Sequence, residues 1–497
     1  MRNLIITVLL VVFVIGLGSC RKDFTTTASS GNLRFSKDTV FLDTIFTNIG
    51  SSTYNLKVYN TSDNDIHIPT IALGRGDNSN FRLLVDGIAG KSFQNIEIKA
   101  NDSLFVFVET TVDILDYTTI ATEFLYKDSI VFDGNLFAQD VKLVTLVKDA
   151  EFIFPATLND GELNDFELTP AQLNFTNTKP YVIYGFPKVP SGQTLTINTG
   201  ARVHFHRNSG LIVENGATLI ADGDVSTDPI LLENEIIFEG DRLESLYDNI
   251  PGQWGTIWLQ EGSTNNLFDH VTIKNATIGI RSDDNDGDLT TTITNTQLYN
   301  HSVNGLFAFK GNIEGKNVVV SNCGQASVAL VLGGTYNFTH CTFTNYWNSS
   351  NRSFPTLLLS NGLENNGTLF LSDLLQANFT NCIIYGNENL EFALEKDNST
   401  AFNYKFTNCL LRFNDFNNQF NTDPLYDFNA VSIFENTLLN QAPAFRDTNN
   451  NNFNIEEGTS AADNTAIDIL PTFTDILGTT RPTGASDIGA YQAIIFN

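Results

Sequence analysis

The sequence is poor in charged residues, and the charges that it has are mostly acidic. Charged residues make up 17% of the 497 residues, against roughly 25% in an average globular protein. Only 28 Lys and Arg stand against 56 Asp and Glu, which gives a formal net charge of −28. This excess of negative charge argues against nucleic acid or anionic lipid as a general partner.

The chain also lacks an apolar run of membrane length beyond residue 20. Its apolar stretch at residues 4–15 follows Arg2 and is followed by small residues. This arrangement is typical of a signal peptide, and the stretch is short for a membrane span. We therefore expect residues 1–19 to be a signal peptide, so that a lipid would be the only membrane anchor.

The signal segment ends in the motif L-G-S-C at residues 17–20. The motif resembles the lipobox of bacterial lipoproteins, in which the Cys is diacylated and cleavage occurs just before it. The resemblance implies that Cys20 carries lipid such as palmitate and anchors the protein in the outer membrane; the alternative is an ordinary signal peptide with an incidental Cys. The following Arg21-Lys22-Asp23 resembles an export signal of Bacteroidota lipoproteins, which implies exposure at the cell surface.

One short phrase recurs six times between residues 268 and 414. Each copy begins with Asn or His, continues with a small or β-branched residue, and has an apolar residue two positions further on. The leading residues are 25, 22, 23, 41 and 27 positions apart: His270, Asn295, Asn317, His340, Asn381 and Asn408. A period of this size indicates a stacked solenoid, and the short alternation indicates strands. The phrase therefore predicts a parallel β-helix with one coil per copy.

The recurring polar residues have a structural interpretation. Equivalent residues of successive coils stack at strand spacing, about 4.7–4.9 Å, so that their amides can hydrogen-bond along the stack. We expect His270 and His340 to be internal members of this ladder rather than catalytic bases. Asn also tolerates the left-handed backbone of sharp corners. We expect these corners at the residues that close four phrases, Asn275, Asn300, Asn322 and Asn345.

Cysteine is scarce, and four of the five cysteines lie within the predicted solenoid. Cys341, Cys382 and Cys409 occupy the same slot of successive phrases, and Cys323 occupies another. Stacked neighbours fall within the Cα separation of a disulfide, and an exported protein can form one. Parallel stacked side chains rarely present the required dihedral angle, so we favour a ladder of free thiols packed as small apolar groups.

The segments around the repeats resemble β-helix proteins that are abundant in Bacteroidota. Alternating strands with Gly at their corners begin at Thr194 and Gly210 and resemble the first coils of right-handed β-helices. Residues 252–259, G-Q-W-G-T-I-W-L, continue the resemblance. It implies a right-handed parallel β-helix over residues 181–440, and it leaves the activity open because fold does not fix function.

The end of the chain carries a second part of this resemblance. The motif D-I-x-G-x-x-R begins at Asp475 and D-I-G-A-Y begins at Asp487, and Gln492 stands where Glu is usual. Together they resemble the C-terminal closing segment of the same β-helix proteins, which we expect over residues 441–497.

The first part of the chain predicts a separate domain. From residue 33 to 150, period-2 strands alternate with turn clusters, which is typical of a β-sandwich. The pattern resembles immunoglobulin-like domains that precede catalytic or binding domains in bacterial surface proteins. Residues 20–32 suit a flexible tether, and residues 151–180 suit a linker and the entry to the β-helix. The predicted fold is therefore all-β, an immunoglobulin-like β-sandwich followed by a right-handed parallel β-helix.

Two groups of aromatic residues are candidates for ligand contact. Trp254 and Trp258 would share one face of a continuous strand. If exposed, they would form a platform for sugar rings; if covered, they would contribute packing. The insertion within the 41-residue interval adds Tyr346, Trp347 and Arg352.

The acidic run D-D-N-D-G-D at residues 283–288 is the candidate metal site. Asp284, Asp286 and Asp288 offer oxygen ligands at alternating positions, which suits calcium. Leu289 stands where the calcium-loop pattern requires Gly, so a solvated turn is the alternative. The nearby run E-G-D-R-L-E at residues 239–244 predicts either surface ion pairs or the lining of a groove.

Catalytic signatures are absent from the sequence. A polysaccharide lyase needs a base beside cations or calcium, and a glycoside hydrolase needs paired carboxylates. The basic residues of the predicted solenoid occupy different repeat slots, and none falls in a recognisable cluster with acids. The preferred prediction is a non-catalytic surface lipoprotein whose rigid β-helix binds a glycan or an outer-membrane protein complex. The alternative is a lyase or glycoside hydrolase that acts on acidic polysaccharide.

Overall fold

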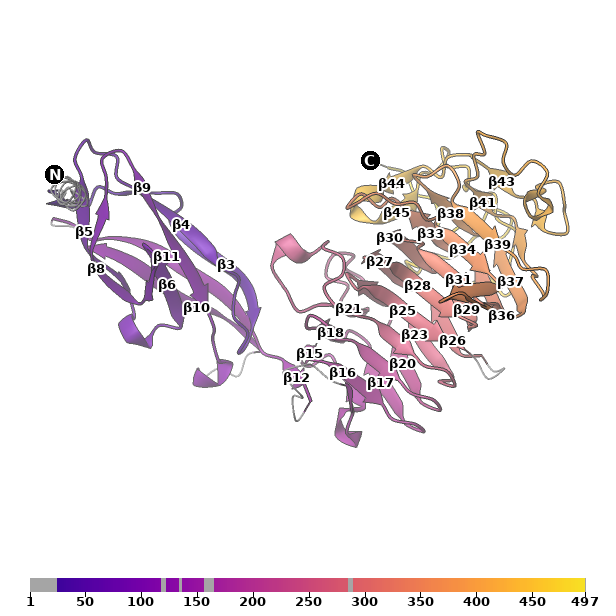
Figure 1. Cartoon of the computed structure of the whole chain (residues 1–497), viewed down its shortest axis with the longest axis horizontal. Coiled ribbons are helices and arrows are strands. Elements are labelled where there is room, and N and C mark those ends of the chain that lie inside the picture. Colours follow the sequence, from indigo (N-terminus) through magenta and orange to yellow (C-terminus); the bar gives the residue numbers. More distant parts are fainter. Residues whose placement is uncertain (1–24, 118–121, 134–135, 156–164, 285–288, 497) are drawn as a thin grey trace, which may run out of the picture. The chain divides into compact units, whose positions relative to one another are not determined.

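The structure is a computed structural model that describes residues 25–117, 122–133, 136–155, 165–284 and 289–496. These residues form strands, short 3-10 turns and loops. None of the described helices is long and apolar enough to cross a membrane. The chain divides into two compact units, Met1–Lys148 and Asp149–Asn497 (Figure 1).

The first unit is a sandwich of two sheets with an apolar core. One sheet contains β1 (Thr27–Ala28), β3 (Thr39–Phe46), β5 (Ile66–Leu73), β8 (Ser92–Ile98), β10 (Glu123–Asp133) and β11 (Gln139–Lys148). The other contains β2 (Arg34–Phe35), β4 (Tyr54–Tyr59), β6 (Phe81–Val85), β7 (Ile88–Gly90) and β9 (Ser103–Thr110). Most pairs are antiparallel, but β1 pairs with β5 and β3 with β11 in parallel.

The predicted sandwich is confirmed, and its strands follow the alternation of the sequence. In β9, Val106 and Val108 are fully buried, whereas Phe105 and Phe107 are exposed. Successive side chains of a strand point to opposite faces, so one face of the sheet fills the core and the other meets solvent.

The second unit is a parallel β-helix of three sheets (Figure 1). The 11-stranded sheet contains β12 (Glu151–Ile153), β15 (Tyr181–Ile183), β18 (Arg202–Phe205), β21 (Ile236–Gly240), β24 (Val271–Lys274), β27 (Gln297–His301), β30 (Val319–Cys323), β33 (Thr342–Asn345), β38 (Ile383–Gly386), β41 (Leu410–Leu411) and β43 (Leu438–Leu439). The 9-stranded sheet contains β13 (Asp165–Glu167), β16 (Phe186–Val189), β19 (Leu211–Val213), β22 (Ile257–Leu259), β25 (Ile278–Asp283), β28 (Asn304–Phe309), β31 (Val328–Val331), β34 (Leu357–Ser360) and β39 (Phe392–Glu395).

The third wall of the β-helix is a 10-stranded sheet. It contains β14 (Asn174–Phe175), β17 (Thr194–Asn198), β20 (Thr218–Asp222), β23 (Asn266–Asp269), β26 (Thr291–Thr294), β29 (Asn312–Lys316), β32 (Gly334–Thr339), β37 (Leu374–Thr380), β40 (Lys405–Thr407) and β42 (Phe434–Glu435). Two hairpins lie outside the walls, β35 (Gly362–Asn365) with β36 (Thr368–Leu371) and β44 (Phe445–Asp447) with β45 (Asn452–Ile455). The predicted solenoid is therefore confirmed.

Inward-facing residues of successive coils stack into columns. Phe338, Phe379 and Phe406, each two positions before a leading residue, form one such column, with ring centroids 5.6 Å and 4.9 Å apart. All three rings are buried. The position two residues before the leading residue, which is Phe in these three copies, is therefore a core position.

The β-helix begins earlier than the sequence predicts. β12, β13 and β14 already pair in parallel with the following coil. The segment that we expected to hold a linker and the entry to the β-helix therefore contains a first coil, whose short strands lack the long alternation of later coils.

The leading residues of the six phrases are the corners between the 10-stranded and 11-stranded sheets. All six have positive φ, from 46° at Asn295 to 55° at Asn408. Asn275, Asn300 and Asn322 also have positive φ and form the expected second row of corners, but Asn345 is not left-handed. Asn recurs in both rows because each coil bends more than once, and Asn tolerates the left-handed backbone that such a bend requires.

Five of the six leading residues form two runs of the predicted ladder, whereas His270 lies against Asp269 and lines a cleft, so it is not the internal ladder member that we expected. Asn317 Nδ2 donates to Asn295 Oδ1 at 2.8 Å, and Asn408 Nδ2 donates to Asn381 Oδ1 at 3.2 Å. His340 Nε2 accepts from Asn381 Nδ2 at 2.8 Å. These side chains lie on the side of the coil that meets the closing segment, whose carbonyls Thr474 O, Ile467 O and Thr465 O accept from Asn317, Asn381 and Asn408.

The closing segment, residues 441–497, packs against the outward face of the 11-stranded sheet. Ile383 and Leu410 of that face are buried with Ile455, Ala462 and Ile488 of the segment. Val319 is buried with Phe453, Ile476, Ala490 and Tyr491. The closing segment thus runs back along coils that lie much earlier in the sequence.

Arg481 fastens this segment to the ladder. Its Nη2 donates to Asn317 Oδ1 at 2.9 Å and to Gly489 O at 2.9 Å, and its Nη1 donates to Gln492 Oε1 at 3.0 Å. Arg481 is 4% exposed. The D-I-x-G-x-x-R and D-I-G-A-Y motifs therefore serve the closure of the wall.

The four described cysteines are free and buried. The backbone N of Cys341 donates to Cys382 Sγ at 3.5 Å, and that of Cys382 donates to Cys409 Sγ at 3.4 Å. The preferred prediction of a thiol ladder is confirmed for these residues.

Candidate functional site

A cleft of about 490 Å³ lies on the outward face of the 11-stranded sheet. One side is formed by the loop between β20 and β21, from Val225 to Leu232. The other side is formed by the closing segment, including Leu477 and Tyr491. Gln297 and Tyr299 of β27 line the floor.

The lining combines amides, hydroxyls and rings. The closing segment contributes four amide side chains, and the sheet and its corner contribute Gln297, Tyr299, Glu235 and His270; the amides are those of Asn450, Asn451, Asn452 and Asn454. A concave surface with a few polar groups among apolar ones is the usual form of a small-molecule site.

Arg202 holds the loop side of the cleft in place. Its guanidinium donates to three loop carbonyls, those of Leu231, Leu232 and Glu235, at 3.0, 2.7 and 2.6 Å. Because Arg202 belongs to β18, the loop is fixed to the wall by a charge-assisted contact.

A row of ionisable groups crosses the same outward face. His204, Glu239, Lys274 and Tyr299 occupy paired positions of successive strands. Lys274 Nζ lies 2.7 Å from Glu239 Oε2, and His204 Nδ1 lies 3.6 Å from Glu239 Oε1. Burial opposes the charge of Lys274, but the attraction of Glu239 outweighs it and raises the pKa of Lys274. Lys274 is therefore a paired cation rather than a base.

Glu235 is a partly buried carboxyl in the lining of the cleft. Burial raises its pKa, and Thr272 Oγ1 donates to its Oε2 at 2.8 Å. His270 lies in the same lining with Nδ1 3.1 Å from Asp269 Oδ1. Burial opposes the charge on His270, but Asp269 outweighs it, so the pKa of His270 is raised.

The two candidate tryptophans do not share a face. Trp254 is 1% exposed, stacks on Phe205 at 4.3 Å and donates from Nε1 to Lys274 O at 2.9 Å. Trp258 points outward from β22, beneath the guanidinium of Arg281 at 4.4 Å. The chain bends at a corner between them, so the alternation of one continuous strand does not apply. Of the two alternatives, the shared platform does not form, and Trp254 contributes packing.

The three candidates of the insertion contribute to packing. Trp347 is 9% exposed and donates from Nε1 to Ser350 Oγ at 2.9 Å. Arg352 forms an ion pair with Glu391 at 2.8 Å, and both side chains are at most 1% exposed. Tyr346 packs beside the closing segment. None of these side chains lines the cleft.

The candidate calcium site is only partly described. Lys310 Nζ lies 3.0 Å from Asp284 Oδ2, whereas Asp286 and Asp288 lie outside the described residues. The described part of the chain holds no group of three or more His, Cys, Asp or Glu side chains placed to bind a metal ion. In the nearby acidic run, Asp241 pairs with His206 at 2.7 Å and Arg242 with Glu244 at 2.9 Å, as expected for ion pairs.

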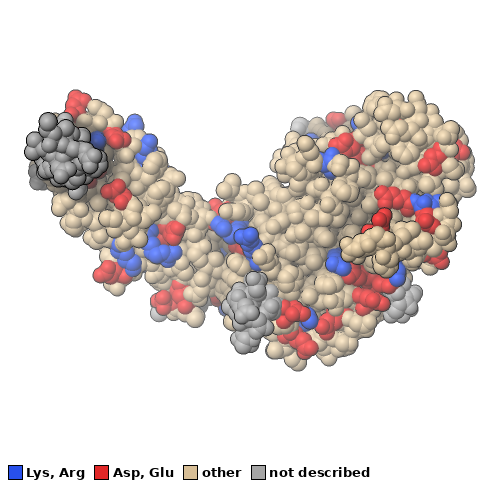
Figure 2. Space-filling model, viewed as in Figure 1, with Lys and Arg blue, Asp and Glu red and all other residues tan. Residues whose placement is uncertain are grey.

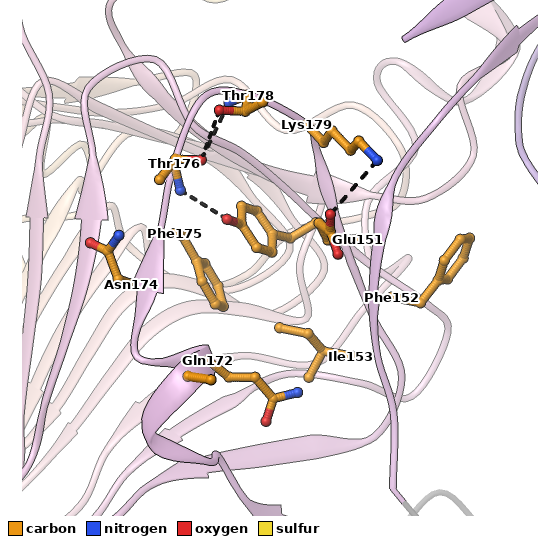
Figure 3. Close-up of a pocket in the computed structure, with 11 residues that line it drawn as sticks. Glu151, Phe152, Ile153, Gln172, Asn174, Phe175, Thr176, Thr178 and Lys179 are labelled. Carbon is orange, nitrogen blue, oxygen red and sulfur yellow. Dashed lines mark hydrogen bonds and ion pairs between the residues drawn. The ribbon is translucent and has the colours of Figure 1, made fainter. Parts of the chain in front are cut away.

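A smaller pocket of about 260 Å³ lies in the first coil (Figure 3). Its groups are already engaged with one another. Phe175 and Tyr181 stack at 4.1 Å, Tyr181 Oη accepts from Thr176 N at 2.9 Å, and Lys179 Nζ lies 3.8 Å from Glu151 Oε1. We therefore favour the larger cleft as the functional site.

Sequence reasoning missed this cleft because its residues come from widely separated segments. Glu235, His270, Gln297 and Tyr491 meet only when the coils stack and the closing segment folds back. The sequence does hold one indication that the outward face of the 11-stranded sheet is special. Glu239 and Lys274 place charges at outward positions of β21 and β24. Figure 2 shows charged residues of the β-helix in small groups separated by broad uncharged areas.

Comparisons with protein-family profiles and with curated proteins found no match. One solved structure with similarity is a family 123 glycoside hydrolase from Clostridium perfringens, reported for glycolipid glycan hydrolysis. The sequence identity is 10%, the TM-score is 0.17, and the match covers 23% of this chain and 26% of that chain. A similarity of this extent supports no argument about fold or function.

Proposed function

We propose that the protein is a non-catalytic lipoprotein of the outer membrane, displayed at the cell surface, whose β-helix binds a glycan. The cleft beside Gln297 and Tyr299 carries the proposal, because amides and hydroxyls on a rigid wall suit the many hydroxyl groups of a sugar. A preformed wall also loses little conformational entropy on binding.

The ionisable row beside the cleft supports binding rather than chemistry. Lys274 is paired with Glu239, and burial lowers the pKa of His204, so neither of these two groups is set up as an exchanging acid or base. The same surface suits a glycan better than a protein complex, since its polar groups line a concavity of about 490 Å³ rather than a flat apolar patch.

Glycan binding is tested by titrating the purified full-length protein with a panel of cell-surface and dietary glycans. Gln297→Ala should weaken binding roughly tenfold, which corresponds to about 1.4 kcal/mol and to the loss of one good hydrogen bond. Gln376→Ala is the matched control, because Gln376 lies on β37 in another wall. Absence of binding to every glycan, together with a stable protein partner in affinity purification, would replace the glycan with an outer-membrane complex.

The membrane anchor is a separate part of the proposal. Cys20 lies outside the described residues, and its support is the L-G-S-C motif. The sandwich would then be a spacer between the anchor and the β-helix. Cys20→Ser should release the protein into the soluble fraction, measured by fractionation and by loss of palmitate labelling; unchanged membrane retention would contradict lipidation.

One observation favours a second candidate, a glycoside hydrolase or lyase acting on acidic polysaccharide. Glu235 lies in the cleft with a raised pKa, as a general acid requires. Incubation with uronate polymers, with and without calcium, would reveal new reducing ends or unsaturated products. If they form and Glu235→Gln abolishes them, the protein is an enzyme and the non-catalytic proposal fails.

A further inference from the structure

The first unit presents an aromatic row on the outward face of its five-stranded sheet. Phe105 and Phe107 of β9 are 47% and 37% exposed. Their ring centroids are 6.1 Å apart and their planes differ by 20°. Leu84, opposite Phe107 on β6, is 38% exposed and extends the apolar surface.

Two cations lie among these rings. Lys57, the strand partner of Phe105, has Nζ 5.2 Å from the ring centroids of both Phe105 and Tyr59. The guanidinium carbon of Arg34 lies 4.7 Å from the centroid of Tyr59. Within the described residues, no carboxylate lies within ion-pair distance of Arg34 or Lys57.

The acids of this face do not cancel these charges. Glu109, two positions beyond Phe107, lies 3.6 Å from Arg82 and also accepts from Thr53. The outward positions of β2, β4, β6 and β9 carry three cations, Arg34, Lys57 and Arg82, against the one carboxylate of Glu109, an excess of two positive charges. Exposed rings beside unpaired cations are unusual in a chain with a net charge of −28.

We propose that this face, formed by Arg34, Lys57, Tyr59, Phe105 and Phe107, binds an acidic polysaccharide. The apolar C–H faces of the sugar rings would stack on the exposed aromatic rings, which supply contact area with little loss of conformational freedom. The carboxylates of the polymer would pair with Arg34 and Lys57 through charge-assisted hydrogen bonds. The sandwich is then a binding module in its own right, with a charge preference that the cleft of the β-helix does not share.

The overall acidity of the chain does not oppose this assignment. At physiological ionic strength, charges are screened beyond about 8 Å. A polymer lying on the face therefore experiences Arg34 and Lys57 more strongly than distant carboxylates. The same screening predicts that binding weakens as salt is added.

Affinity electrophoresis of the detergent-purified full-length protein tests the proposal, with alginate in one gel and neutral dextran in another. We expect alginate, but not dextran, to retard the protein. The double variant Phe105→Thr/Phe107→Thr should bind alginate roughly tenfold more weakly, since Thr suits a strand but cannot stack. Lys57→Gln should weaken binding several-fold and reduce its dependence on salt.

Two controls separate this face from other surfaces. Phe41→Thr removes a ring that is 51% exposed on β3, in the other sheet, and should leave retardation unchanged. Gln297→Ala, in the cleft of the β-helix, should also leave it unchanged, so failure here is distinct from failure of the proposed cleft. The proposal is overturned if alginate does not retard the wild type. It is equally overturned if Phe41→Thr loses as much retardation as the double variant, or if Lys57→Gln and the folded double variant lose none.

Discussion

The two halves of one wall differ in what covers them. In the later coils of the 11-stranded sheet, the outward residues Val319, Ile383 and Leu410 are apolar and lie beneath the closing segment. In the earlier coils, the outward positions carry Glu239 and Lys274 and adjoin the cleft. The inward residues of both halves are alike, so the same coil supports two different exteriors. The outward side chains, rather than the fold, therefore decide where the wall is closed and where it can bind.

The largest effect on stability is expected in the covered half, from the loss of the Arg481 side chain. Burial lowers the pKa of Arg481 to about 10, although Asp475 and Asp487 oppose this, so the group remains a cation. Arg481→Met should lower the free energy of unfolding by about 3–5 kcal/mol, because the buried oxygens that accept from the guanidinium would lose their donor. Urea unfolding followed by circular dichroism would measure the loss, and limited proteolysis should cut first within residues 441–497. An unchanged midpoint with intact protease resistance would show that the segment does not depend on Arg481.

A second pair of variants compares a left-handed Asn corner beneath the closing segment with one in the earlier coils. Asn381 bonds to His340, Asn408 and Ile467 and has a φ of 53°. Asn381→Ala should lose about 2–4 kcal/mol from these bonds and from left-handed strain. Asn275 has a φ of 65° and donates to Asp248 O, so Asn275→Ala should lose only about 1–2 kcal/mol. Equal losses in the free energy of unfolding would remove the distinction between covered and open corners.

The two leading histidines, His340 and His270, should respond to pH with opposite signs. Burial lowers the pKa of His340 to about 3. Its neutral ring is therefore favoured in the fold, and its contribution falls by about 1.4 kcal/mol per pH unit below the unfolded value of roughly 6.5. The pKa of His270 is raised, as Asp269 outweighs burial, so its contribution is full below that value and is lost as pH rises through the folded pKa.

Conservative variants isolate these two effects. Other copies of the phrase carry Asn in the same slot, so His340→Asn and His270→Asn should preserve these corners. Unfolding free energies between pH 4 and 8 should become less acid-sensitive for His340→Asn, and His270→Asn should change in the opposite direction. NMR titration of the two rings would measure both pKa values, and two normal values would contradict the prediction.

The smallest effect on stability is expected for Arg281, on the solvent-facing side of the 9-stranded sheet. Arg281 pairs with Asp283 at 2.8 Å, and its side chain is 39% exposed. Solvent screens such a pair, so Arg281→Gln should change the free energy of unfolding by less than about 1 kcal/mol. Thermal unfolding of the two proteins provides the comparison. A loss as large as that of Asn381→Ala would mean that this wall, too, has an unrecognised structural role.

The sequence predicts the coils well because their signals are local. Asn, His and Cys return in each phrase at positions that the period alone places in register, and Phe379 and Phe406 mark the core in the same way. The first coil escapes prediction because β12 and β14 are three and two residues long. Alternation over so few residues carries little information.

The candidate site is less predictable because it depends on contacts between distant segments. Tyr491 reaches Gln297 across 194 positions, and no local pattern anticipates that approach. The Trp254–Trp258 pattern misleads because it presumes a continuous strand where the chain turns a corner. Arg352 attracts attention as a lone cation within an insertion, but its partner Glu391 lies 39 positions later. The residue type at an exposed position is set by binding or by closure of the wall, and the repeat does not predict it.

The contact between Asn317 and Arg481, 164 positions apart, also orders events in time. A chain that is still emerging can stack its coils by local contacts, but it leaves the ladder amides and Val319 open until the last residues arrive. Closure over such a separation is slow compared with coil formation. A chain without the closing segment would expose the apolar outward face of the later coils and would leave the ladder amides without their carbonyl partners. We expect such an open flank to be cut by proteases that do not cut the closed wall.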